Sequence, residues 1–181
     1  MKISFIQNSF FCLFLIILLV NVFSQSTDYT IEEVKFNSQG VTLAGSILRP
    51  EKPFAAVVIV HGSDPVKREM EFAKRLAKEG IAVLTYDKRG VGESGGIYVG
   101  PSVGTNNIDT TNLNLLSSDA NAAVNTFRTY LKDKKIPIGL VGYSQAGWII
   151  PITASKNPQI EFMVLFSCPT ITTLEQLRFQ F

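Results

Sequence analysis

Histidine and cysteine are the scarcest chemically reactive residues of this sequence. Its 181 residues include one histidine, His61, and two cysteines, Cys12 and Cys168. Cys12 lies in an N-terminal apolar run that we expect to be removed, which leaves Cys168 alone. One cysteine cannot form an internal disulfide, so a disulfide-held scaffold is excluded and the hydrophobic core must hold the fold together. We interpret Cys168 as a packed thiol rather than a nucleophile, because no partner base accompanies it.

Charged residues are also few, and no sign predominates. Lys and Arg number 17, Asp and Glu number 15, and the net charge is +2. The basic residues are scattered, so we expect no nucleic-acid partner. The densest charged stretch, residues 132–135, mixes both signs and is typical of a solvated turn. The length suits one domain, and 46% of the residues are apolar, which is enough for a sizeable core.

The N-terminus has the pattern of an export signal. Lys2 precedes an unbroken apolar run at residues 10–20, and polar residues follow. The run is too short to span a bilayer comfortably and suits the core of a signal peptide. We predict cleavage after Ser24, giving a signal peptide at 1–24 and a domain at 25–181. The protein would then be exported, to the periplasm or outside the cell, with no stable membrane span; an uncleaved anchor or a buried helix are the alternatives.

Apolar periodicity predicts alternating strands and helices. The first two strands are separated by a turn-forming Asn-Ser-Gln-Gly cluster, and several later strands are continuous apolar runs, typical of strands buried on both faces. This alternation predicts an α/β fold with a mostly parallel, twisted sheet and helices on both faces. Strands are expected at 31–36, 41–48, 55–60, 81–86, 136–142 and 162–166, and helices at 66–79, 113–131 and 145–155.

Three segments follow predicted strands, at the edge where open α/β sheets place their sites. They are His-Gly-Ser at 61–63, Asp-Lys-Arg-Gly-Val-Gly-Glu-Ser at 87–94 and Gly-Tyr-Ser-Gln-Ala-Gly at 142–147. In this order they resemble the α/β-hydrolase superfamily, and within it exported serine esterases, serine aminopeptidases and dienelactone-hydrolase-like enzymes. The resemblance covers about residues 31–168. It implies no cofactor and no metal.

The resemblance implies catalytic roles for residues of the first and third segments. Ser144, at a sharp strand-to-helix turn, would be the catalytic nucleophile. The backbone N–H groups of Gln145 and Ser63 would form the oxyanion hole. The superfamily usually has glycine two residues after the serine, where this chain has Ala146. The substrate would be a small acyl compound or a short peptide, with an ester, thioester or peptide bond to cleave.

Other interpretations of the same residues stay open. Ser144 could belong to an ordinary strand–helix turn. His61 is in the wrong chain order for the superfamily's base, so we interpret it as structural, bonded to neighbouring backbone. We also favour structural roles for Asp87, Arg89 and the glycines of the second segment, and a core position for Trp148. We expect Asp119, which precedes the serine, to lie on a helix surface.

The resemblance further implies a catalytic acid and histidine that this sequence does not contain. Residues 172–175 have the spacing of a helix N-terminus, with no stop signal after them, and the strand at 162–166 would be an exposed apolar edge. We therefore expect a truncated sequence: a fragment, a frameshift product or a shortened gene. The leading prediction is a serine hydrolase that is active only in a complete form. The alternative is a non-catalytic, hydrolase-like binding module or inactive fragment.

Overall fold

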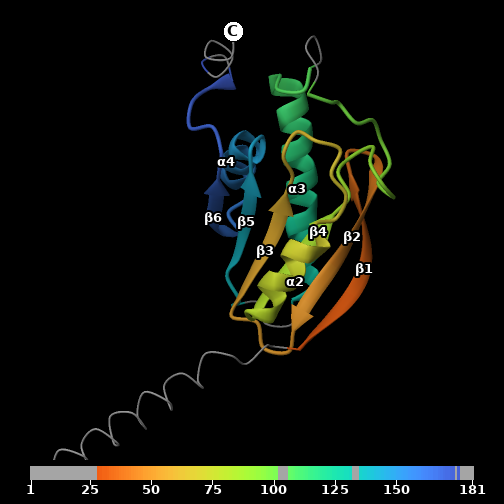
Figure 1. The fold of residues 1–181 in the computed structure, drawn as a ribbon, viewed down its shortest axis with the longest axis vertical. Helices are drawn as coiled ribbons and strands as arrows, with labels where there is room; N and C mark the ends of the chain where they lie inside the picture. Colours follow the sequence, from red (N-terminus) through yellow and green to blue (C-terminus); the bar gives the residue numbers. More distant parts are fainter. Residues whose placement is uncertain (1–27, 102–105, 132–134, 174, 176–181) are drawn as a thin grey trace, which may run out of the picture.

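The computed structural model describes residues 28–101, 106–131, 135–173 and 175. They form a six-stranded sheet of order β1-β2-β4-β3-β5-β6, with helices on both of its faces (Figure 1). β3, β4, β5 and β6 are mutually parallel. β1 pairs antiparallel with β2, and β2 pairs antiparallel with β4. The elements are β1 (Tyr29–Ser38), β2 (Val41–Pro50), β3 (Ala55–Val60), α2 (Met70–Lys78), β4 (Ile81–Tyr86), α3 (Thr110–Tyr130), β5 (Ile138–Tyr143), α4 (Ala146–Lys156) and β6 (Ile160–Phe166).

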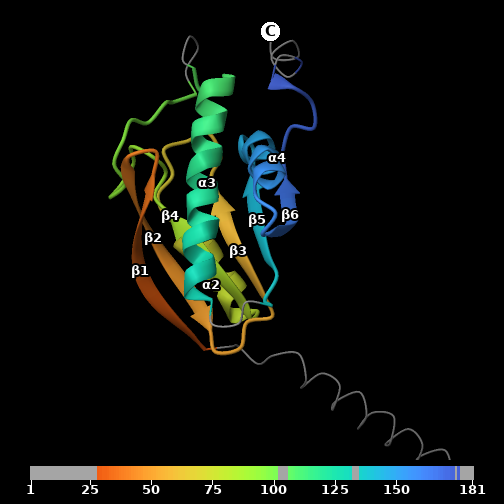
Figure 2. The ribbon, with the colours of Figure 1, turned by 180° about the vertical axis from the view of Figure 1, so that it is seen from behind.

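The central strands are apolar because each of their faces packs against helices. Side chains alternate between the faces of a strand. In β3, Ala56, Val58 and Val60 belong to the core under α3 and α4, whereas Val57 and Ile59 belong to the core under α2. Figure 2 shows α3 and α4 together on one face, opposite α2. The predicted α/β layering is therefore correct.

A tight hairpin forms the first two strands. Its turn consists of Gln39 and Gly40, with φ values of 50° and 75°. Positive φ at both central positions is the geometry of the two-residue turn that matches the twist of antiparallel strands. The two predicted strands and the turn between them are confirmed, and both strands are longer than predicted.

Two helices begin at residues other than those predicted, because side chains bind backbone N–H groups near their starts. α2 begins at Met70 rather than residue 66. The N–H of Arg68 donates to Asp87 Oδ1 at 2.9 Å and that of Glu69 to Thr85 Oγ1 at 2.9 Å, which ties this backbone to β4 and its loop. α3 begins earlier than predicted, since the Asp109 carboxylate accepts the Asn112 N–H at 2.7 Å and caps the helix.

The predicted apolar edge is present at β6. Met163, Val164, Leu165 and Phe166 are each between 41% and 47% exposed. Beyond the strand, the predicted capping box is also present: Thr172 N–H donates to Glu175 Oε2 at 3.0 Å, and Glu175 N–H donates to Thr172 Oγ1 at 3.3 Å.

The predicted signal peptide lies outside the described residues, as does most of the charged stretch at 132–135. No helix within the described ranges has the length and apolar character needed to cross a bilayer.

Candidate active site

The first and third segments meet at the carboxyl ends of β3 and β5. A Cβ atom built on Gly62 would lie 3.5 Å from the Ser144 Cβ and 3.2 Å from the Tyr143 ring. Glycine at position 62 therefore lets the loop after β3 approach the serine closely. This contact follows from the parallel pairing of β3 with β5, which aligns Val60 with Gly142.

Ser144 stands on a strained turn between β5 and α4. Its φ is +54°, a left-handed conformation that non-glycine residues adopt rarely, and its side chain is exposed. A Cβ on Gly142 would lie 2.6 Å from the Ala146 Cβ and 2.6 Å from the Val60 carbonyl, so only glycine fits there. The methyl group of Ala146, the departure from the usual pattern, is accommodated by that glycine. The local geometry presents the serine hydroxyl to solvent.

Two backbone N–H groups remain open beside this serine. Among the described residues, neither the Ser63 nor the Gln145 N–H has a hydrogen-bond partner. The Ser144 N–H, in contrast, donates to the Ser167 carbonyl at 3.2 Å. Ser63 follows Gly62, the glycine that lets this loop approach Ser144, and Gln145 precedes the first turn of α4. These two N–H groups are therefore the candidates for the oxyanion hole that the resemblance implies.

A buried lysine behind these groups went unrecognised in the sequence. Lys88 is 3% exposed, and its Nζ donates to the carbonyls of Gly62 at 2.7 Å and Ser63 at 3.1 Å, and to Gln145 Oε1 at 3.2 Å. Burial lowers the pKa of Lys88 to about 8. Gln145 in turn donates from Nε2 to the Asn107 carbonyl at 2.8 Å. These partners lie 25 to 57 residues from Lys88 along the chain, and no local pattern marks them.

His61 is buried, as expected for a structural histidine. It is 2% exposed, bonds to the Tyr86 backbone and packs edge-on against the Tyr86 ring, with centroids 4.6 Å apart. Its Nε2 has no hydrogen-bond partner among the described residues. Burial, and then the charge of Lys88, lower the pKa of His61 to about 4, so the ring is neutral at pH 7.

The turn after β4 is a closed structural unit. The Asp87 carboxylate accepts the Glu93 N–H at 2.8 Å and also binds Arg68, which pairs with Glu33 and Glu93. Burial alone would raise the pKa of Asp87, but these hydrogen bonds lower it below its usual value. The structural interpretation of Asp87 is consistent with these contacts.

Arg89, in the same turn, shows that the expectation for Asp119 was wrong. Asp119 is 1% exposed, not on the helix surface, and accepts Arg89 Nε at 2.9 Å. Arg89 also donates to the Ser38 carbonyl at 3.0 Å. The apolar stripe of α3 could have revealed this burial, because Asp119 lies three residues after Leu116 and one before Ala120, on the same helical face.

Cys168 and Trp148 anchor the segment that follows β6. A Cβ on Gly147 would lie 2.6 Å from the Cys168 Cβ, so the thiol packs against α4, and burial raises its pKa. Trp148 packs against the main core while its Nε1 donates to the Ile171 carbonyl at 2.9 Å. These contacts fit the packed thiol and core tryptophan that the sequence favoured.

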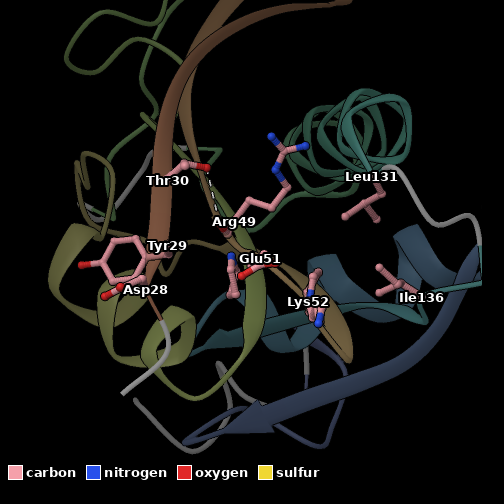
Figure 3. A pocket seen from close by; sticks show the side chains of 10 residues that line it. Asp28, Tyr29, Thr30, Arg49, Glu51, Lys52, Leu131 and Ile136 are labelled. Atoms are coloured by element: carbon pink, nitrogen blue, oxygen red, sulfur yellow. Dashed lines mark hydrogen bonds between the residues drawn. The ribbon is translucent and has the colours of Figure 1, made fainter. Parts of the chain in front are cut away.

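A cavity of about 550 Å³ lies at the opposite end of the sheet (Figure 3). Its lining contains no serine, cysteine or histidine, so it offers neither a nucleophilic serine or thiol nor a histidine base. We therefore place the candidate site at Ser144, where the open donors lie. Within the described residues, no cluster of three or more His, Cys, Asp or Glu could hold a metal ion. The cavity is lined by Asp28, Tyr29, Thr30, Arg49, Pro50, Glu51, Lys52, Pro53, Leu131 and Ile136.

Known proteins share this fold. The family model of serine aminopeptidase S33 matches residues 51–178. A search of curated protein sequences returned no match. Among solved structures, a hypothetical protein from Pseudomonas aeruginosa is similar, with a TM-score of 0.63 and 20% identity over 86% of this chain and 52% of its own.

Two further solved structures carry enzyme names. An esterase of Pyrococcus furiosus has a TM-score of 0.58 and 23% identity, over 80% of this chain and 51% of its own. A dienelactone hydrolase from Anabaena variabilis has a TM-score of 0.60 and 19% identity, over 77% of this chain and 64% of its own. The chain thus spans about half to two thirds of the length of these structures.

Proposed function

The chain belongs to the serine aminopeptidase S33 family of α/β hydrolases, and from this premise we propose that Ser144 is the nucleophile of a serine hydrolase. Its hydroxyl oxygen would attack an acyl carbon, forming an acyl-enzyme and releasing the leaving group. Water would then hydrolyse the acyl-enzyme. The substrate would be a small acyl compound or a short peptide, cleaved at an ester, thioester or peptide bond.

The strained turn at Ser144 is the observation that carries the proposal. A non-glycine residue at a φ of +54° destabilises the native state, and such strain is concentrated at functional sites. The strain exposes the hydroxyl beside two open N–H donors, those of Ser63 and Gln145. Donors of this kind stabilise the oxyanion of the tetrahedral intermediate, each by about 3 kcal/mol. An ordinary strand–helix turn requires neither feature.

The proposal also requires a base, and the residues of this sequence do not supply a suitable one. His61 is the one histidine, and it is buried and neutral at pH 7. We therefore propose that the active species is a longer form of the protein, with the catalytic histidine and acid in its additional part. The length of the similar structures is consistent with this requirement. We propose further that the protein is exported through the N-terminal signal.

Covalent labelling tests the nucleophile directly. The native protein, isolated from its source cells, is treated with a fluorophosphonate, which phosphonylates activated serines, and the modified peptide is identified by mass spectrometry. We expect modification at Ser144, with heat-unfolded protein as the control. Labelling at Ser167, the neighbouring exposed serine, would contradict the assignment. Absence of labelling in the folded native protein would favour the alternative, a non-catalytic binding module.

A further inference from the structure

Lys88 connects the two residues that would form the oxyanion hole. Its Nζ donates to the Gly62 and Ser63 carbonyls on one side and to the Gln145 side chain on the other. An ammonium group has three N–H donors, so these three acceptors satisfy it completely. One buried cation therefore contacts both the loop after β3 and the turn after β5, which contains Ser144.

Peptide geometry gives the contact with Gly62 a particular consequence. The Gly62 carbonyl and the Ser63 N–H belong to the same peptide group, which is planar and trans. In such a group the C=O and N–H bonds point in opposite directions. Lys88 Nζ holds the carbonyl at 2.7 Å, so the Ser63 N–H is directed away from the lysine and stays open.

We propose that Lys88 is a positioning residue that locks the Gly62–Ser63 peptide in the orientation required for the oxyanion hole. The proposal rests on the function proposed above, in which Ser144 forms an oxyanion. Lys88 touches no substrate in this role. A charged donor also polarises the peptide it binds, which strengthens the Ser63 N–H as a donor.

The surrounding contacts support a clamp at this position. Tyr98 OH donates to the Ser63 carbonyl at 2.8 Å, and the Tyr98 ring lies 5.5 Å from Lys88 Nζ. Gln145 Nε2 donates to Asn107, whose own Nδ2 donates to the Val99 carbonyl at 2.7 Å. The loop that follows β4 is therefore fastened to the adjacent Ser63–Asp64 peptide and to the Gln145 side chain, and Lys88 is the one charged group among these donors.

The lock should depend on pH, because Lys88 loses its proton near pH 8. A neutral amine keeps two N–H groups for three acceptors, so at least one contact is lost. The titratable neighbours are His61, neutral at pH 7, Tyr98, whose pKa is raised by burial, and Asp64, whose charge opposes the lowering of the Lys88 pKa. Asp87, the preceding residue, is paired with Arg68.

Selective isotope labelling can observe this peptide alone. Labelling glycine carbonyls with ¹³C and serine amides with ¹⁵N marks Gly–Ser peptides, of which the sequence has two, Gly62–Ser63 and Gly45–Ser46. We expect the Gly62 carbonyl shift to titrate with a midpoint near pH 8, whereas Gly45, within β2, stays flat. The titration should vanish in Lys88→Met and persist in Lys67→Met, an exposed lysine. A flat Gly62 signal in the wild-type protein would overturn the proposal, even where Lys88→Met does not fold.

Kinetics then test the catalytic consequence in the form that shows Ser144-dependent turnover. We expect Lys88→Met to lower kcat by about tenfold to a hundredfold with KM nearly unchanged, because loss of a whole oxyanion donor lowers kcat by about a hundredfold to a thousandfold. Lys67→Met should match the wild type. A raised KM with unchanged kcat would overturn the positioning role. Absence of Ser144-dependent turnover would overturn the proposed function, while the carbonyl titration would still decide whether Lys88 holds the peptide.

Discussion

Two glycine-rich turns follow β4 and β5, the parallel strands on either side of β3, and they differ in how their polar groups are used. In the turn after β4, Asp87 binds a backbone N–H and Arg68, and Ser94 Oγ donates to the Asp87 carbonyl at 2.6 Å while accepting the Ala44 N–H at 3.0 Å. In the turn after β5, Ser144 is exposed and strained, and the Gln145 N–H is open.

The difference separates stability from function. Polar groups that are buried and paired stabilise a fold, whereas open donors and backbone strain destabilise it and persist where chemistry needs them. Both turns have similar glycine-rich sequences and similar places in the sheet. Hydrogen-bond satisfaction, rather than the motif, therefore distinguishes the structural turn from the one that we propose to be reactive.

The comparison predicts its largest effect for the two serines. In the form that shows turnover, Ser144→Ala should lower kcat on the order of a millionfold, the loss seen when a serine protease loses its nucleophile. Its free energy of unfolding should change little, because the exposed hydroxyl stabilises no contact. Ester hydrolysis and urea unfolding measure the two quantities.

Ser94→Ala is the matched control, with the opposite pattern. It leaves two backbone groups without their partner, which should destabilise the fold by about 1–3 kcal/mol, while turnover per folded molecule stays at the wild-type level. Wild-type turnover in Ser144→Ala, or a large loss of turnover in folded Ser94→Ala, would refute the division between the turns.

Local sequence patterns predicted the strands and the sharp turn at Ser144, because those depend on near neighbours. The bounds of β3 and β4 match the predicted 55–60 and 81–86, since a strand buried on both faces is an unbroken apolar run. The turn at Ser144 was recognisable because Gly142 is required by contacts with Ala146, four residues on, and with the adjacent strand β3.

The buried polar contacts were harder to predict, because their partners are far apart in the chain. Arg89 and Asp119 are separated by 30 residues, and Lys88 and Gln145 by 57. The burial of Asp119 was predictable from its place on the apolar face of α3, but its partner was not. No periodicity indicates that Lys88 turns inward at the end of β4.

The contribution of the closed turn to stability can be measured at the Arg89–Asp119 ion pair. Asp119→Ala leaves Arg89 buried without its carboxylate, and breaking a buried pair in this way typically destabilises a protein by about 3–5 kcal/mol. Glu71→Ala removes an exposed pair with Lys74 and should change the free energy of unfolding far less, because solvent screens exposed pairs. Urea unfolding at pH 7 compares the variants. Equal stabilities would show that the β4 turn does not depend on its buried charges.

His61, between the two turns, should make stability depend on acid. Its pKa of about 4 in the folded protein lies below the ordinary histidine value of 6.5, so the unfolded chain binds a proton first as the pH falls. The contribution of the neutral His61 ring to the free energy of unfolding is fully present above pH 6.5. It is lost progressively as the pH falls toward 4, by about 3 kcal/mol in all.

Carboxylates also titrate in part of this range, so a variant is needed to isolate the histidine. His61→Phe keeps a ring against Tyr86 and removes the titration. The difference in unfolding free energy between wild type and variant should therefore vary between pH 7 and pH 4.5. A constant difference would mean that His61 is not buried as a neutral ring.

The smallest expected effect concerns the strain at the reactive turn itself. Ser144→Gly removes the side chain that disfavours a φ of +54°, and a left-handed conformation destabilises a non-glycine residue by about 1–2 kcal/mol. The greater freedom of glycine in the unfolded chain offsets part of that gain, so we expect a net stabilisation of about 1 kcal/mol or less, with turnover abolished.

Gln39→Gly, at a φ of 50° in the β1–β2 turn, should stabilise the protein similarly and leave turnover intact. Ser118→Gly, inside α3, should destabilise it by about 0.5–1 kcal/mol, since helical φ gives glycine no advantage there. If Gln39→Gly stabilised the protein and Ser144→Gly did not, the reactive turn would be unstrained, and its difference from the closed turn would lie in its open hydrogen-bond donors alone.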